Sequence, residues 1–167
     1  MITNLEQLYF DQLRDLFSAE TQLIAALPEM AANASHEELR DAFNHHLDET
    51  RTQRARLQEI FESHGISGEG EECDAVRGLV KEANKHVANT SPGSVRDAVL
   101  IASGNRVEHY EIAAYGVARA FAQCLGFDED ARILTKSIEE EGNADKALTK
   151  IASGGLFGTG VNEEATH

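Results

Sequence analysis

The sequence predicts an all-α protein in which four long helices form two hairpins, with a short fifth helix in the crossover between the hairpins. Three observations support this fold class. Apolar residues recur at helical spacing along most of the chain. Only Pro28 and Pro92 among the 167 residues are prolines, so few helices are interrupted. Short glycine-containing or polar stretches at residues 33–35, 64–72 and 126–128 mark the expected turns.

The first hairpin consists of two helices joined by a very short turn. Thr3 and Ser35 each precede a glutamate by three residues, as in a capping box, and we expect each to be an N-cap. The first helix continues to about residue 32, and the second ends at Gly65. Because the turn at residues 33–35 is so short, the two helices must be antiparallel neighbours.

The crossover begins with the glycine-rich acidic loop at residues 64–72. Residues 74–87 then have apolar side chains on one side and form a modest helix. A long connection between the second and third long helices is the connectivity of ferritin-like bundles. The sequence therefore predicts a ferritin-like four-helix bundle with a short fifth helix in the crossover.

The second hairpin follows Ser91-Pro92, which we expect to be the N-cap and first residue of the third long helix. Gly126 ends that helix, and Asp128 is the expected cap of the fourth, which continues to about residue 152. The predicted organisation is a bundle over residues 1–152 and a glycine-rich tail over residues 153–167. Two tail residues are apolar and could dock on the bundle, namely Leu156 and Phe157.

Four acidic residues fall at matched heights in the two hairpins. Glu20 and Glu49 are equally distant from the centre of the first turn, and Glu111 and Glu141 from the centre of the second. Folding places each pair side by side, about 20 Å from its turn. Two level pairs of carboxylates inside a four-helix bundle are the framework of a dinuclear metal site.

Helical-wheel positions predict which acids point inward. Glu20, Glu111 and Glu141 fall within apolar stripes, where a carboxylate without a partner is costly or stays protonated. A divalent cation would compensate several such carboxylates at once. Glu108 and Asp145 lie about one turn farther from Gly126 and form a second layer, with Asp145 on the inner face and Glu108 at its edge.

The second helix contributes a histidine as well. His46 lies at the centre of its apolar face and Glu49 at the edge, three residues apart, so that both can face one site. The usual bundle motif, Glu-x-x-His, is reversed here, and His46 is either a ligand or a hydrogen-bonded neighbour of the ligands. Such a donor set favours two iron ions per chain, or alternatively manganese. The candidate metal-binding residues are Glu20, Glu49, Glu111, Glu141, Asp145, Glu108 and His46.

Composition excludes several classes of function. The formal net charge of −14 argues against nucleic-acid binding and against adhesion to anionic membranes. No apolar run is long enough to span a membrane, and the N-terminus does not resemble a secretory signal. Cys73 and Cys124 match no zinc motif and favour a reducing compartment. We therefore expect a cytoplasmic protein.

Four segments resemble the helices of the YciE/YciF family of ferritin-like proteins: LFSAETQL (16–23), HLDETRTQRARLQEIF (46–61), RVEHYEIAAYG (106–116) and LTKSIEEEGNADKALTKIA (134–152). The third segment is the most specific. The resemblance implies a ferritin-like fold, a homodimer, an association with stress response and a di-iron site. Carried over by position, it points to the same seven candidate residues.

These observations lead to three functional hypotheses. The first is a ferritin-like di-metal carboxylate protein with redox activity toward a small oxidant such as oxygen or peroxide. The second is a non-catalytic dimeric stress or interaction module, in which buried acids pair with Arg54 or Arg106 or stay protonated. The third is a manganese-type enzyme that removes peroxide and releases oxygen.

Overall fold

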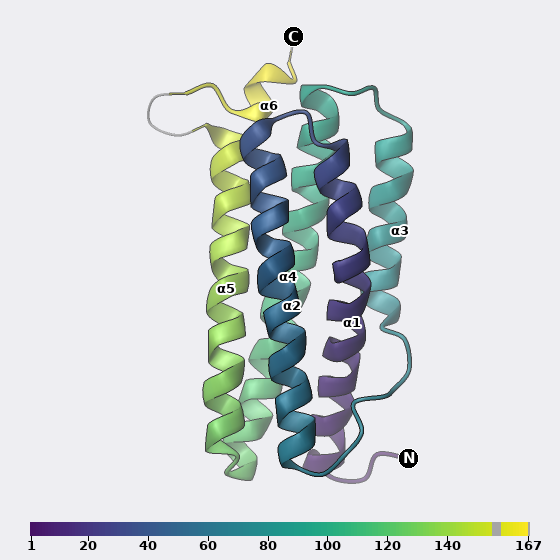
Figure 1. The fold of residues 1–167 in the computed structure, drawn as a ribbon, viewed down its shortest axis with the longest axis vertical. Coiled ribbons are helices and arrows are strands. Elements are labelled where there is room, and N and C mark those ends of the chain that lie inside the picture. The colour runs from purple at the N-terminus through teal and green to yellow at the C-terminus, as the bar shows by residue number, and fades with distance from the viewer. Residues whose placement is uncertain (155–157, 167) are drawn as a thin grey trace.

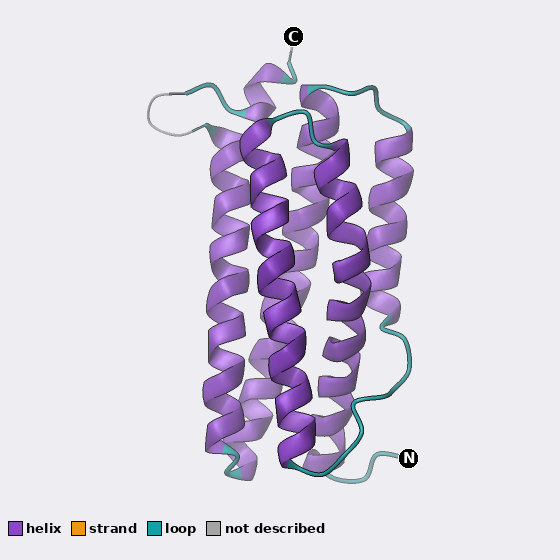
Figure 2. Cartoon of the chain, viewed as in Figure 1, coloured by secondary structure: helices purple, strands orange, loops and turns teal. Residues whose placement is uncertain are grey.

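The computed structural model describes residues 1–154 and 158–166, and over these residues the chain is helical without strands (Figure 2). The all-α prediction is confirmed. Leu156 and Phe157, the expected docking residues of the tail, lie outside the described residues. The helices are α1 (Leu5–Asn33), α2 (Glu37–Ser63), α3 (Asp74–Ala88), α4 (Ser94–Leu125), α5 (Asp128–Ser153) and α6 (Val161–Glu164).

The long helices α1, α2, α4 and α5 run side by side as two antiparallel hairpins (Figure 1). The connection after α2 climbs along the bundle before α3 begins, and α3 packs on the outside of α1 and α4. The short α6 packs against α4 and α5 at the end of the bundle near the C-terminus. No helix of the described residues is both long and apolar enough to cross a membrane.

The helix starts in the first hairpin differ from the predicted ones. Asn4, not Thr3, is the N-cap of α1, and its side chain accepts a hydrogen bond from the Gln7 backbone N–H at 2.8 Å. The predicted cap at Ser35 is also wrong, because the N-cap of α2 is His36, which makes no side-chain capping bond. Instead the Asp97 carboxylate of α4 accepts hydrogen bonds from the backbone N–H groups of Ser35 and His36, at 2.8 and 2.9 Å. A tertiary contact thus replaces the local cap.

The starts of α4 and α5 are shifted as well. The N-cap of α4 is Gly93, at φ 131°, a backbone conformation that favours glycine, so the predicted start at Ser91-Pro92 is two residues early. Asp128 is the first residue of α5, and Phe127 is its N-cap. Gly126 ends α4 in the left-handed conformation, as predicted, at φ 74°.

The core consists of two apolar clusters along the bundle, with a buried polar layer between them. One cluster includes Leu13 and Leu16 of α1 and lies toward the N-terminal end of that helix. The other includes Leu23 and Leu27. Glu20 lies between Leu16 and Leu23 and is fully buried. The helices therefore place a level of acidic side chains inside the bundle, between two apolar layers that exclude water.

Candidate metal centre

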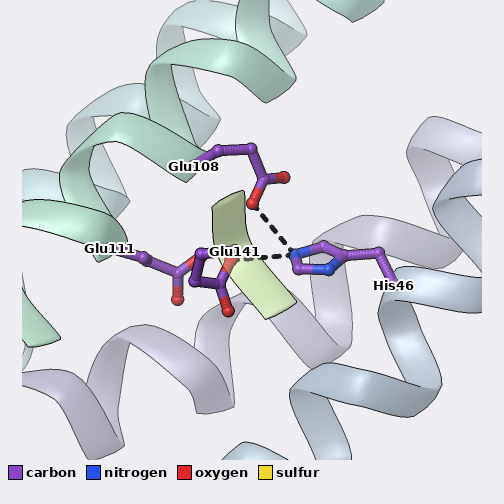
Figure 3. Close-up of side chains that lie close together, drawn as sticks. All are labelled: His46, Glu108, Glu111 and Glu141. Carbon is purple, nitrogen blue, oxygen red and sulfur yellow. Dashed lines mark ion pairs between the residues drawn. The ribbon is translucent and has the colours of Figure 1, made fainter. Parts of the chain in front are cut away.

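Four buried side chains from three helices converge in the polar layer (Figure 3). His46 comes from α2, Glu108 and Glu111 from α4, and Glu141 from α5. Each offers one potential ligand atom, and these atoms all lie within 4.8 Å of one another. Glu108 and Glu111 reach the same place because residues three apart on a helix share a face. A group of this size is compact enough to share metal ions.

Glu20 lies in the same layer on α1, although it is outside the group of four. It is fully buried, and the hydroxyl of Tyr115, also fully buried, donates a hydrogen bond to its Oε1. Burial, followed by the charge of Glu141, raises the pKa of Glu20 well above its usual range. The charge of Glu141 therefore acts on Glu20 as well as on the other three members of the group of four.

Glu141 is held by an amide. Gln53 of α2 donates through Nε2 to Oε1 of Glu141 and also to Oε2 of Glu140, the latter at 3.1 Å. Glu140 in turn accepts two hydrogen bonds from the guanidinium of Arg56, at 2.6 and 2.8 Å. Among the described residues, the arginine of this network therefore binds the outward neighbour Glu140 and makes no hydrogen bond with Glu141, although its charge lowers the pKa of Glu20 to a small extent.

Most of the remaining acceptor atoms in the layer have no hydrogen-bond partner. Within residues 1–154 and 158–166, the buried atoms without a hydrogen bond include both carboxylate oxygens of Glu111 and one oxygen each of Glu20 and Gln53. Nε2 of His46 and one oxygen each of Glu108 and Glu141 also lack a hydrogen bond, but these two oxygens lie 3.3 and 3.6 Å from that nitrogen as ion-pair contacts. Buried carboxylates are normally paired, because an unpaired buried charge is costly. Convergent, unpartnered oxygen donors beside an imidazole are the donor set that iron or manganese accepts.

Burial and mutual repulsion dominate the electrostatics of this layer. Burial first, and then the charges of Glu141, Glu20 and Glu108, raise the pKa of Glu111 well above its usual range. Burial, then a hydrogen bond with Glu141 and the charge of that residue, raise the pKa of Glu108, and the pKa of Glu141 is raised by burial against the opposing effect of His46. Neighbouring carboxylates that oppose each other's ionisation favour binding of a cation between them.

His46 is oriented by carboxylates on both sides of its ring. Its Nδ1 lies 3.3 Å from Oε2 of Glu49, and its Nε2 lies 3.3 Å from Glu108 and 3.6 Å from Glu141. Burial alone would lower the pKa of His46, but the hydrogen bond with Glu49 and the charge of Glu141 outweigh it, so that the pKa is raised. The imidazole thus connects the buried acids with the more exposed Glu49.

Two of the candidate residues, Glu49 and Asp145, lie outside the buried layer. The Glu49 side chain is 22% exposed and contacts His45 and His46 rather than the other acids. Asp145 turns toward Asn105, whose side chain donates to it at 2.6 Å, and toward His109 at 3.2 Å. The structure therefore brings together four of the seven candidates, places Glu20 in the same buried layer, and leaves Glu49 and Asp145 at the edge.

The arginines expected to neutralise the acids do not reach them in the described part of the chain. Arg54 donates to the Thr21 hydroxyl at 2.8 Å and lies over the ring of Phe17. Arg106 is exposed and makes no salt bridge among the described residues. A neutral buried layer without metal would therefore require protonated carboxyls.

Comparison with known proteins places this arrangement in a family. A family model described as "Domain of unknown function (DUF892)" matches residues 4–166. The chain belongs to this family. It is 40% identical over 149 residues to the protein YciF of Escherichia coli strain K12, covering 89% of this chain and 90% of YciF. The resemblance to YciE/YciF proteins that the four segments indicated is thereby confirmed.

Solved structures agree with this assignment. The structure of the Escherichia coli stress protein YciF matches with a TM-score of 0.86 and 39% identity, over 89% of this chain and 94% of that one. The structure of YcfI from Rhodopseudomonas palustris matches with a TM-score of 0.88 and 38% identity, over 90% and 96%. A protein from Xanthomonas campestris, at 20% identity and a TM-score of 0.70, shares the fold.

Sequence reasoning did not identify the residues that hold the acids in place. Tyr115 is not among the seven candidate residues, yet its hydroxyl donates a hydrogen bond to Glu20. Its position four residues after Glu111 on α4 could have indicated this role, because such residues share a helix face. Gln53, an amide on the apolar face of α2, carried a similar signal, since a buried amide requires partners.

Proposed function

We propose that this protein binds two divalent iron or manganese ions in the polar layer of its bundle, through Glu20, Glu108, Glu111, Glu141 and His46. The observation that carries the proposal is the convergence of unpartnered, fully or almost fully buried carboxylate oxygens on one imidazole. Charge supports the number of ions. The four buried glutamates carry −4 when ionised, and two divalent ions carry +4, which leaves the layer neutral.

The chain's own residues would hold the centre rather than react. Tyr115 fixes one oxygen of Glu20 and Gln53 fixes one oxygen of Glu141, which leaves the second oxygen of each carboxylate without a hydrogen bond and available as a ligand. The apolar clusters cover the layer at both of its ends along the bundle. Iron or manganese bound there would supply Lewis acidity and redox chemistry with oxygen or peroxide as the small oxidant.

Elemental analysis tests the metal proposal. The protein is purified without chelator, and metal-free protein is also loaded anaerobically with Fe(II) or Mn(II). We expect about two ions per chain. Glu111→Gln and Glu141→Gln keep the size of the side chain and remove a ligand charge, so both should lose most of the metal. Glu139→Gln, an exposed position on α5, is the matched control and should keep it.

Absence of metal above background in the loaded wild-type protein would leave the second hypothesis, a non-catalytic stress or interaction module. The raised pKa values of the buried acids favour that alternative, since protonated carboxyls need no metal. Oxygen release from added peroxide by the manganese-loaded protein would instead support the peroxide-removing enzyme. The Escherichia coli relative is a stress protein, and we extend a role in stress response to this chain.

We also propose that the protein forms a homodimer. Two of the large exposed apolar side chains, Val95 and Val117, lie on α4, at 52% and 42% exposure. Exposed apolar side chains on one long helix are suited to helix-to-helix association. Sedimentation equilibrium should give twice the chain mass, and Val117→Lys should shift the equilibrium toward the monomer.

A further inference from the structure

A pocket of about 210 Å³ lies between α2 and α5 and reaches the buried acids. His45, His46 and Glu49 of α2 line one side, Ala147 of α5 lines the other, and Glu108 of α4 lies at the inner end. Two residues of the buried group, His46 and Glu108, therefore line this pocket, which opens to solvent at its other end. The metal proposal does not assign a role to this passage or to His45.

Along this pocket, imidazole and carboxylate groups alternate from the surface inward. The side chain of His45 is 77% exposed, that of Glu49 is 22%, that of His46 is 5% and that of Glu108 is 3%. Nε2 of His45 lies 3.4 Å from Oε1 of Glu49, and Nδ1 of His46 lies 3.3 Å from Oε2. Nε2 of His46 lies 3.3 Å from Glu108. Each of these groups thus lies 3.3 to 3.4 Å from the next one along the pocket.

We propose that this pocket is the entrance to the metal centre and that His45 and Glu49 form the first binding site for the incoming divalent ion. A hydrated cation loses its water stepwise, and each lost water must be replaced by a protein donor. Glu49 offers a carboxylate and His45 an imidazole where water is still present. The same two groups would be a poor permanent site, because exposure weakens their attraction for the ion.

The proposal rests on the metal-binding function and gives Glu49 a different role from the one the sequence indicated. A permanent ligand should change the amount of metal bound, whereas an entrance residue should change only the rate of uptake. The inward neighbours of Glu49, which are His46 and Glu108, would receive the ion from it. This division separates the buried group from the two residues at the mouth.

Stopped-flow uptake of Co(II) by metal-free protein distinguishes these roles, because bound Co(II) absorbs visible light. We expect Glu49→Gln to slow uptake on the order of tenfold, the lower end of the range for electrostatic guidance, with the final stoichiometry unchanged. His45→Ala removes a nitrogen donor rather than a negative charge and should also slow uptake without changing the stoichiometry. Ala147→Phe should also slow uptake, by filling the pocket. Asp48→Asn removes one exposed charge from the same turn of α2 and should leave the rate near the wild-type value.

Three results would contradict the proposal that this pocket is the entrance to the metal centre. Wild-type rates in Glu49→Gln and Ala147→Phe would show that ions enter elsewhere. Equal slowing by Asp48→Asn would show that only general charge matters. A lower final stoichiometry in Glu49→Gln would make Glu49 a permanent ligand. Failure of the metal-binding function is distinguishable from all three, because the wild-type protein would then take up no Co(II).

Discussion

Two buried acidic sites in this bundle differ in how their charge is satisfied. At the end of the bundle, Asp130 accepts a hydrogen bond from the Tyr9 hydroxyl at 2.9 Å, and its Oδ2 lies 2.7 Å from Nε2 of His64. In the central layer, neither oxygen of Glu111 has a partner among the described residues. Both side chains are buried, Asp130 at 5% and Glu111 at 0% exposure.

The difference separates a structural acid from one suited to bind a ligand. Asp130 joins α1, the end of α2 and the start of α5, and its partners satisfy it within the fold. Glu111 is surrounded by other carboxylates, which raise its pKa. Such an arrangement costs stability when the carboxylates are ionised, and either protonation or a bound cation would offset that cost. Burial alone does not distinguish the two sites, but the number of hydrogen-bond partners does.

Among the tests of this contrast, metal loading should have the largest effect on the stability of the protein. Two bound ions at a free concentration of 100 times Kd would stabilise the fold by about 5 kcal/mol. For a chain of this size, that raises Tm by about 10–20 °C. Differential scanning calorimetry with and without Mn(II) or Fe(II) measures the shift. An unchanged Tm under both conditions would remove the distinction between the two sites.

Asp130→Ala should destabilise the protein by about 2–3 kcal/mol, because it leaves the Tyr9 hydroxyl and His64 without their buried partner. Urea denaturation measures the loss, which should be the same with and without metal. Asp128→Ala, at an exposed position of the same helix start, should cost less than about 1 kcal/mol. A metal-dependent loss in Asp130→Ala would contradict a purely structural role.

Glu111→Gln should have the opposite effect to Asp130→Ala. It should stabilise the metal-free protein by about 1–3 kcal/mol near neutral pH. Burial raises the pKa of Glu111 in the folded chain, so the folded state binds more protons than the unfolded one. The stability of the metal-free wild type is therefore fully retained below the usual glutamate pKa and lost as the pH rises toward the folded-state value.

The advantage of Glu111→Gln over wild type should consequently grow as the pH rises above the usual range of a glutamate pKa. Denaturation curves at several pH values give this difference directly. Glu139→Gln serves as the control, because its exposed carboxylate should produce no such trend. A constant difference across these pH values would show that Glu111 titrates normally and is not under strain.

Tyr115→Phe should have the smallest effect. It removes the hydroxyl that donates to Glu20 and should weaken metal binding by about tenfold, the lower end of the range for residues that orient ligands. Competition with a metal-sensitive dye measures this affinity. Tyr9→Phe removes the corresponding hydroxyl at Asp130 and should reduce stability without changing metal affinity.

The sequence alone determined the five longer helices, though not the starts of four of them or the short α6, together with their pairing and the level of the acids. Apolar spacing predicted four long helices and a short one, and Gly126 ends α4 as expected because glycine tolerates a positive φ. The equal distances of Glu20, Glu49, Glu111 and Glu141 from their turns follow from a constant helical rise. These features depend on local spacing, which a sequence states directly.

Only the tertiary structure decided which acids meet. Glu108, expected at the edge of its helix face, is buried beside His46, whereas Asp145, expected on the inner face, turns toward Asn105 and His109. The start of α2 likewise depends on Asp97, a residue about 60 positions away. A rotation of a helix by a few tens of degrees moves a side chain between core and edge, and neighbouring helices set that rotation.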